Sequence, residues 1–205
     1  MTIALPSRTA SHRYNWVAIV LHWTIGLGIL ATLAMGLAMA HAPLSPLIKF
    51  KLFQLHKSVG LTILMAAMLR LLWRLAHRPP PLPGDMPAWE KSAAEGTHVL
   101  LYVLMIGMPL VGWALVSASP LNIPTVLYGV VPWPHIPVTA WFGWNKPQAS
   151  AVLDTIHAYG GYALIALLLL HVGAALRHHF ILRDTVLRRM IPGLPWLGRP
   201  TLRRG

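Results

Sequence analysis

Four long apolar stretches constrain the fold of this 205-residue chain more than any other feature. They predict membrane-spanning helices, because a helix of about 20 apolar residues crosses a bilayer. Lys57 and Arg70 fall near the ends of the second stretch, where long basic side chains reach the interface. The first stretch is too long for a cleaved signal peptide. We therefore predict an all-α membrane protein, a single domain over 1–205 built as a four-transmembrane-helix bundle. The predicted spans are approximately residues 16–40, 52–76, 98–119 and 153–179.

Composition agrees with a membrane location. Hydrophobic residues make up 56% of the chain and charged residues 11%, whereas a soluble domain has about a quarter of its residues charged. A soluble enzyme is therefore excluded. The chain has no cysteine, which excludes disulfides, iron–sulfur clusters, thiolate metal sites and haem attached through a C-x-x-C-H motif.

The net charge of +12 has a topological explanation. Counted with the helix ends beside them, the N-terminal segment, the second connection and the C-terminal tail contain 13 of the 17 Lys and Arg residues. The other two connections, counted in the same way, contain four. Basic residues concentrate on the cytoplasmic side of membrane proteins. We therefore predict a multi-pass protein of the bacterial inner membrane, in contact with lipid and not with nucleic acid, with both termini cytoplasmic.

Proline-rich segments connect the predicted spans. The first connection is predicted at 41–51, and the second at 77–95 contains a proline run that favours an extended polyproline spacer. The third, at 120–150, is predicted to be a long periplasmic loop that caps the bundle in the interfacial region. The tryptophans that suit such a cap are Trp133, Trp141 and Trp144.

Five histidines lie within the predicted spans, where an ionisable side chain is costly and marks a candidate functional site. A single buried histidine more often serves helix packing, but five in four helices favour a shared role. These five are His22, His56, His98, His157 and His171. The histidines expected on the surface are His12, His41, His77 and His135. At the cytoplasmic interface, the two expected to face lipid headgroups are His178 and His179.

Four of the five histidines form pairs by depth. His157 and His171 are 14 residues apart, which corresponds to a rise of about 21 Å and nearly four full turns, so both project from one side of the last helix. Because successive helices cross in alternate directions, His56 matches the level of His157, and His22 matches that of His171. Two pairs should therefore face each other across the bundle, one near each membrane surface.

Two imidazoles at each level suit haem b better than zinc. A zinc ion takes four protein ligands, or three and a water, whereas a porphyrin leaves its iron only two axial positions. The paired histidines are therefore predicted to be metal ligands of two non-covalent bis-histidine haem b groups. For three of these histidines, the residue four positions later is a glycine. It lies on the same helical face as the histidine and leaves room for a flat macrocycle or for helix packing. These glycines are Gly26, Gly60 and Gly161.

Other polar residues are candidates for supporting roles. His98 is predicted beside the inner haem or in contact with a quinone. Arg70, Arg74 and Arg177 could pair with haem propionates or anchor the bundle at the interface. At the periplasmic end, lysines face a single acid, Asp154; they could raise the encounter rate of a small anion or be ordinary solvated charges. These lysines are Lys49, Lys51, Lys57 and Lys146.

Six stretches of the chain match one known family, namely RYNWVAIVLHW, LHKSVGLTILMAAMLRLLWRL, RPPPLP, HVLLYVLMIGMPLVGW, HAYGGYALIALLLLHVGAALRHHF and DTVLRRMIP. With these stretches, the chain resembles the bacterial cytochrome b561 family, whose members include a membrane-bound superoxide oxidase. The resemblance covers most of residues 13–192. It implies that His22 and His171 bind one haem and that His56 and His157 bind the other, in agreement with the depths. It also implies electron transfer between a periplasmic donor and ubiquinone.

The leading hypothesis is a superoxide:ubiquinone oxidoreductase in which the haem irons carry the redox chemistry and no side chain acts as a nucleophile. His98, His178 or His179 could relay the protons that a quinone needs. One alternative is an electron-carrier subunit that links a partner dehydrogenase to the quinone pool. Another is a haem-free transporter with buried histidines, although the sequence has no inverted repeat or pair of broken helices.

Overall fold

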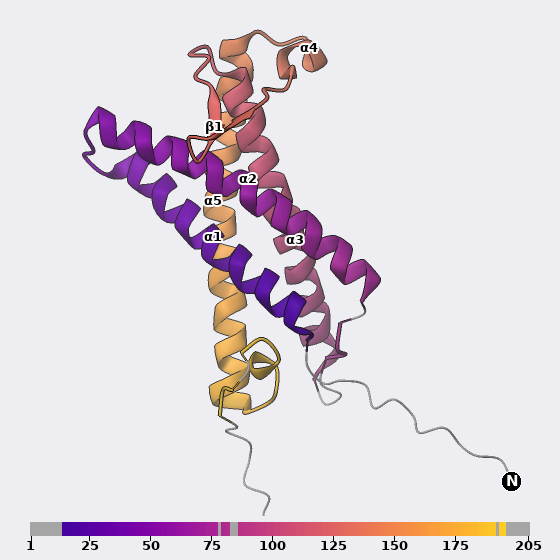
Figure 1. Ribbon diagram of the computed structural model, residues 1–205. Helices are drawn as coiled ribbons and strands as arrows, with labels where there is room; N and C mark the ends of the chain where they lie inside the picture. Colours follow the sequence, from indigo (N-terminus) through magenta and orange to yellow (C-terminus); the bar gives the residue numbers. More distant parts are fainter. Residues whose placement is uncertain (1–13, 78, 83–85, 192, 196–205) are drawn as a thin grey trace, which may run out of the picture.

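Four long helices dominate the molecule (Figure 1). All four are long and apolar enough to cross a membrane, so the predicted all-α, four-helix membrane fold is confirmed. They are α1 (Trp16–His41), α2 (Pro46–Ala76), α3 (Ala88–Ala118) and α5 (Lys146–Arg177). The structure, a computed structural model, describes residues 14–77, 79–82, 86–191 and 193–195.

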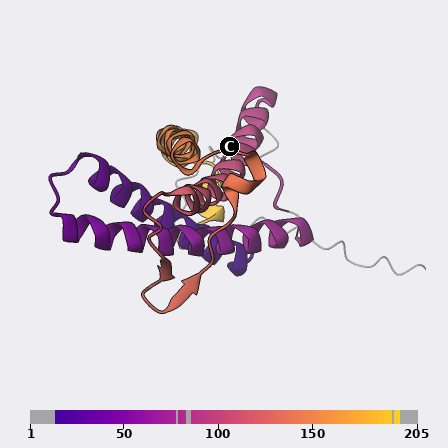
Figure 2. The same ribbon diagram turned by 90° about the horizontal axis from the view of Figure 1, so that it is seen from above.

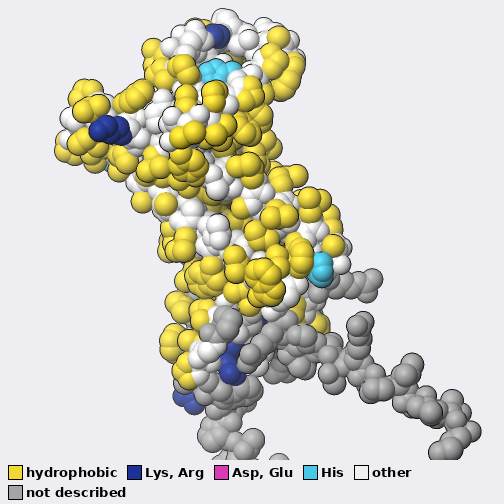
Figure 3. Space-filling view, in the orientation of Figure 1, with side chains coloured by type: hydrophobic (Ala, Val, Ile, Leu, Met, Phe, Trp, Pro, Cys, Tyr) yellow, Lys and Arg dark blue, Asp and Glu magenta, His cyan; other side chains and the backbone are white. Residues whose placement is uncertain are grey.

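Helix α1 begins, and α5 ends, at the same end of the bundle (Figure 1). We call this the inner end and the opposite one the outer end. Apolar side chains cover the middle of the face drawn in Figure 3, and basic side chains lie toward its two ends. The described basic residues of the inner end are Arg70, Arg74, Lys91, Arg177, Arg183, Arg188 and Arg189. The predicted cytoplasmic orientation also rests on basic residues that lie outside the described ones, namely Arg8, Arg13, Arg78, Arg199, Arg203 and Arg204. His12, predicted on the surface, lies outside the described residues too.

The helices extend beyond the predicted spans because capping residues start them outside the apolar stretches. The Ser45 side chain accepts a hydrogen bond from the Ile48 backbone N–H, and Pro46 occupies the first turn, where its missing N–H costs nothing. Asn145 likewise accepts a hydrogen bond from the Gln148 N–H at 2.9 Å and caps α5.

All three connections are therefore shorter than predicted. The first spans 42–45 and not 41–51, so His41, predicted in that loop, ends α1. The second spans 77–87 and not 77–95. Hydropathy marks only the part of a helix that suits the bilayer, whereas backbone hydrogen bonding continues through polar turns until a cap or a proline ends it.

The third connection, predicted at 120–150, spans 119–145 because α5 already begins at Lys146, and it folds into a cap over the outer end (Figure 1). It contains a two-stranded antiparallel hairpin and a short helix. The Tyr128 backbone N–H donates to Ser58 Oγ at 3.0 Å and ties the hairpin to α2. The elements of the cap are β1 (Thr125–Leu127), β2 (Val131–Trp133) and α4 (Val138–Phe142).

Helix α5 stands apart from the α1–α2 pair. Helix α1 packs on α2, α2 on α3, and α3 on α5, whereas the backbone of α5 makes few close approaches to α1 or α2. Figures 1 and 2 show α1 and α2 side by side, crossing α5 obliquely. Side chains therefore span the distance between α5 and this pair.

A layer of buried apolar side chains crosses the middle of the bundle. On α5 its member is Leu164, seven residues after His157 and seven before His171, so it lies about 10.5 Å along the axis from each. The layer therefore separates the two histidine levels. Its members are Ile25, Ile29, Ile63, Ala67, Met105 and Leu164.

Candidate functional site

The structure brings four histidines together in two pairs. The ring centres of His56 and His157 are 6.1 Å apart, and those of His22 and His171 are 6.2 Å apart. Two imidazoles that bind one metal from opposite sides, through bonds of about 2 Å, place their ring centres about 6 Å apart. Both separations therefore suit bis-histidine ligation of a single iron.

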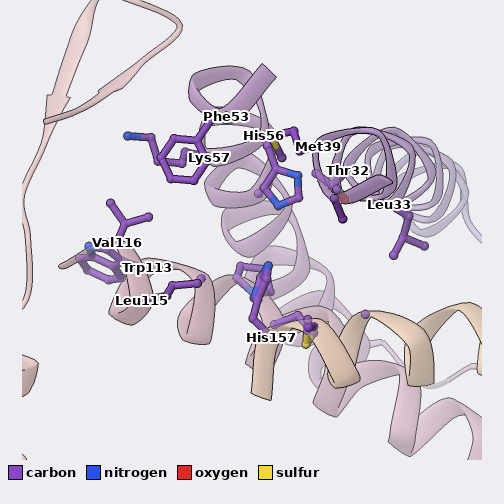
Figure 4. Close-up of a pocket in the computed structure, with 18 of the residues that line it drawn as sticks. Thr32, Leu33, Met39, Phe53, His56, Lys57, Trp113, Leu115, Val116 and His157 are labelled. Carbon is purple, nitrogen blue, oxygen red and sulfur yellow. The ribbon is translucent and has the colours of Figure 1, made fainter. Parts of the chain in front are cut away.

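A cavity of about 700 Å³ surrounds the outer pair and is lined by α1, α2, α3 and α5 (Figure 4). This volume lies within the range of about 300–1,000 Å³ that is typical of cofactor sites. Gly60 and Gly161 line the cavity, and a Cβ on either would meet nothing within 4 Å. Gly26, at the inner level, also borders open space. The glycines that the sequence singles out thus lie where a flat group has room.

Two buried ring nitrogens of the outer pair have no hydrogen-bond partner in the described part of the chain. They are Nδ1 of His56 and Nδ1 of His157. A buried polar atom without a partner costs about 1–3 kcal/mol. A metal-binding histidine uses one nitrogen for the metal and commonly donates the other N–H to a backbone carbonyl. The backbone of Thr32 lies beside the His56 ring, and that of Met108 beside the His157 ring. The residues therefore fit a bis-histidine haem b.

Two glycines that the sequence analysis missed lie against the outer histidines. A Cβ on Gly112 would lie 3.0 Å from Cε1 of His157, and a Cβ on Gly36 would lie 3.7 Å from Cε1 of His56. Gly112 belongs to α3, which contributes no histidine to the outer pair. Spacing within a single helix cannot reveal this contact, because it depends on how α3 packs against α5.

We expect Gly112→Leu to displace His157 and to lower the affinity for the outer haem about 10- to 100-fold, because overpacking a tight site costs about 1–3 kcal/mol. The haem-to-protein ratio of the purified protein measures this loss. Gly96→Leu is the matched control on α3, since Gly96 is exposed and its Cβ would meet nothing within 4 Å. Full haem content in Gly112→Leu would show that His157 does not depend on this contact.

The inner level contains three histidines rather than two. The ring centres of His98 and His171 are 5.8 Å apart, close to the separation between His22 and His171. His98 thus lies beside the inner pair. By distance alone, either His22 from α1 or His98 from α3 could share a metal with His171.

Two arginines lie close to the inner histidines. Arg70 Nη1 donates to the Ala18 carbonyl oxygen at 2.6 Å, which holds the guanidinium between α2 and α1. The Arg74 guanidinium lies 5.5 Å from the ring centre of Tyr102, a cation–π distance. Both positions are compatible with the predicted role toward haem propionates.

Three other inner-end residues have surroundings that differ from those predicted. Arg177 pairs with Glu90 on α3 at 2.6 Å, an ion pair that the sequence did not indicate. His178 and His179, expected to face headgroups, are 9% and 4% exposed. They are buried because the chain folds back beneath the bundle after α5.

The outer lysines differ in exposure. Lys49 and Lys51 are exposed, whereas Lys57 is buried and Lys146 half-buried, and the last two donate hydrogen bonds to the cap. Burial, together with the positive charges of Lys57 and Lys146, lowers the pKa of His135. This loop histidine is therefore mainly neutral at pH 7, and the lysines supply the positive charge around it.

Comparisons with known proteins agree with the geometry of the site. A model of the prokaryotic cytochrome b561 family matches residues 13–193. Two proteins of Escherichia coli (strain K12) are similar to this chain. Cytochrome b561 homolog 2 is 30% identical over 183 residues, which cover 87% of this chain and 91% of the relative. Cytochrome b561 homolog 1 is 29% identical over 184 residues, which cover 88% and 98%. A Yersinia pestis protein named probable superoxide oxidase CybB is 29% identical over 188 residues, which cover 88% and 96%.

Proposed function

The chain belongs to the prokaryotic cytochrome b561 family of haem b membrane electron-transfer proteins, and we propose that it binds two b haems and passes electrons from superoxide to ubiquinone. The observation that carries this proposal is the presence of two histidine pairs, 6.1 and 6.2 Å between ring centres, on two levels. His56 and His157 would hold the outer haem, and His22 and His171 the inner one. Haem b supplies one-electron redox chemistry at its iron when bound.

The proposed direction of transfer follows from the distribution of charge. The excess of arginine at the inner end supports a cytoplasmic position for that end in the bacterial inner membrane. The outer end, with its cap and lysines, would then face the periplasm. Electrons would enter at the outer pair and leave at the inner pair.

The choice of superoxide rests on the outer lysines and on one relative. Positive charge at a site raises the encounter rate of a small anion, and the Yersinia pestis relative carries the name probable superoxide oxidase. In the proposed reaction, two superoxide ions each lose one electron and become dioxygen. One ubiquinone takes up those two electrons and two protons and becomes quinol.

A stopped-flow experiment tests the proposal. Purified haem-loaded protein is mixed with superoxide and a short-chain ubiquinone, and quinol formation is followed together with the haem absorbance. We expect superoxide to reduce the haem and quinol to form in a ratio of one quinol to two superoxide ions consumed. Protein with its full haem content that forms no quinol from superoxide would contradict the proposal.

Charge neutralisation at the outer end should slow the reaction with superoxide. We expect Lys49→Gln with Lys51→Gln to lower kcat/KM about three- to tenfold at low ionic strength, because both side chains are exposed and long-range steering is lost. The dependence on salt should flatten as well, since screening removes the same effect. Lys91→Gln, which removes a single positive charge at the inner end, is the control. An unchanged salt dependence would show that these lysines do not guide the anion.

An electron-carrier subunit is the second candidate, and the exposed cap favours it. Apolar side chains project from the hairpin and α4, and such patches mark interfaces with a protein or a membrane surface. This function predicts haem-loaded protein that co-purifies with a dehydrogenase and forms no quinol from superoxide. The exposed side chains and their exposed fractions are Tyr128 57%, Val130 77%, Trp141 63% and Phe142 61%.

A further inference from the structure

His178 continues a line of interior positions on α5. His157, Leu164, His171 and His178 follow one another at intervals of seven residues, and each interval rises about 10.5 Å and turns nearly two full turns. The two earlier histidines face partners across the bundle, and Leu164 and His178 are 5% and 9% exposed. His178 therefore lies on the face of His171, about 10.5 Å nearer the inner surface.

The backbone reverses directly after this position. The last turn is a π-helix, His178–Leu182, and Arg183 follows with φ 53° in the left-handed region. Both features are uncommon, and π turns occur often at functional sites. The Asp184 backbone N–H then donates to the His178 carbonyl oxygen at 3.1 Å. The reversal thus returns an acidic residue to His178.

The Asp184 carboxylate is held against the His178 ring. Its Oδ2 lies 2.5 Å from Nδ1 of His178, and its Oδ1 accepts a hydrogen bond from the Val186 N–H at 2.9 Å. The His178 side chain is 11% exposed and that of Asp184 is 22% exposed. The acid therefore lies on the more water-accessible side of the pair, and the imidazole lies deeper.

Two contacts fix this segment beneath the inner histidine level. Trp23 Nε1 donates to the Met190 carbonyl oxygen at 2.9 Å, and the Trp23 ring centre is 5.4 Å from that of His22. Arg189 is buried, and its Nη1 donates to the Pro81 carbonyl oxygen at 2.5 Å. The His178–Asp184 pair thus belongs to an ordered part of the fold next to the inner site.

The other ionisable groups nearby are less suited to carry protons inward. An imidazole bound to a metal cannot offer the same nitrogen to a proton. Glu90 is occupied by its ion pair with Arg177. His98 lies beside His171 and is in no ion pair within the described residues. His178 alone, among the described histidines, pairs with a carboxylate.

We propose that Asp184 and His178 form a proton relay that supplies the quinone at the inner end. This inference rests on the proposed function, because quinone reduction is the step that needs protons. Asp184 takes a proton from water and passes it to Nδ1 of His178, while Nε2 of His178 releases its proton to a quinone oxygen. Between transfers the ring exchanges protons with water, gaining one at Nε2 and losing one at Nδ1, so that Nδ1 can accept again. Two such transfers, with the two electrons taken from two superoxide ions, complete the quinol.

Comparing two electron acceptors tests the relay. Ubiquinone needs protons, whereas ferricyanide takes an electron without one. In Asp184→Asn we expect quinol formation to slow about 100-fold, in the range lost with a general acid, and ferricyanide reduction to stay at the wild-type rate. Asp184→Glu should restore most of the quinone rate, and the Asn variant should show a larger solvent deuterium isotope effect. His178→Gln keeps a hydrogen-bonding group but cannot transfer a proton, and it provides the same test if Asp184→Asn does not fold.

Glu90→Gln removes another inner-end carboxylate and is the control that should retain both activities. Equal loss with both acceptors in Asp184→Asn and His178→Gln would show that the pair is only structural and would overturn the relay. Unchanged quinone reduction in both variants would overturn it too, and would leave the proposed function intact. Haem-loaded wild-type protein that reduces ferricyanide but no quinone would instead contradict the proposed function itself.

Discussion

Replacing His157 with alanine should remove one haem and leave the other. His157 lies in the outer pair only, 6.1 Å from His56 between ring centres, and the apolar layer that includes Leu164 separates it from His171. Without one of its two proposed ligands, the outer haem would bind more weakly, whereas the inner level would be unaffected. We expect the haem-to-protein ratio and the Soret absorbance per protein to fall by about half, and superoxide-driven haem reduction to fall by at least about 100-fold.

Two further variants make this result specific. His56→Ala should have the same effect, because both members of the pair would be needed to hold the proposed outer haem. His135→Ala removes an outer-end histidine that lies in the cap, and it should retain both haems. Equal loss of both haems in His157→Ala would contradict two independent sites and would indicate that His157 supports the whole bundle.

Replacing His171 with alanine should remove the inner haem and stop quinol formation. His171 lies within 6.2 Å of His22 and 5.8 Å of His98 between ring centres, so both candidate pairs depend on it. We expect quinol formation to fall by at least about 100-fold, while superoxide still reduces the remaining haem. The haem-to-protein ratio and the two rates, measured on one preparation, check this outcome.

The partner of His171 can be identified by the same measurement. We expect His22→Ala to lose the inner haem and His98→Ala to keep it. Gly26 follows His22 by one turn and borders open space, whereas Tyr102 occupies the corresponding position after His98. A flat macrocycle has room beside His22 for that reason. Retention in His22→Ala with loss in His98→Ala would assign the iron to His98 and His171.

Much of the architecture could be predicted because the bilayer simplifies the problem. A membrane requires helices of about 20 apolar residues, so hydropathy located all four. Helix ends were less predictable. They depend on caps such as Ser45 and Asn145 and on polar turns, such as those at Lys49 and Lys51, that remain helical outside the apolar stretch.

The surroundings of the inner-end histidines were harder to predict. In the sequence, His178 and His179 stand at the end of the last predicted span, so they were predicted to lie at the membrane interface. Their burial follows from the π turn and from the reversal at Arg183, which bring Asp184 back to the ring. A change from α to π geometry has no clear composition signal, so hydropathy could not indicate it.

By itself, the sequence determined the spans and the order of functional positions along each helix, because the α-helix has a constant rise and turn. That is why His157 and His171 could be placed on one face of α5 from their spacing alone. The tertiary structure decided which side chains meet across helices. The distance between the His98 and His171 rings and the close approach of Gly112 to His157 depend on the tilt and rotation of α3 relative to α5. Those angles are set by close packing over the whole interface, which no single helix encodes.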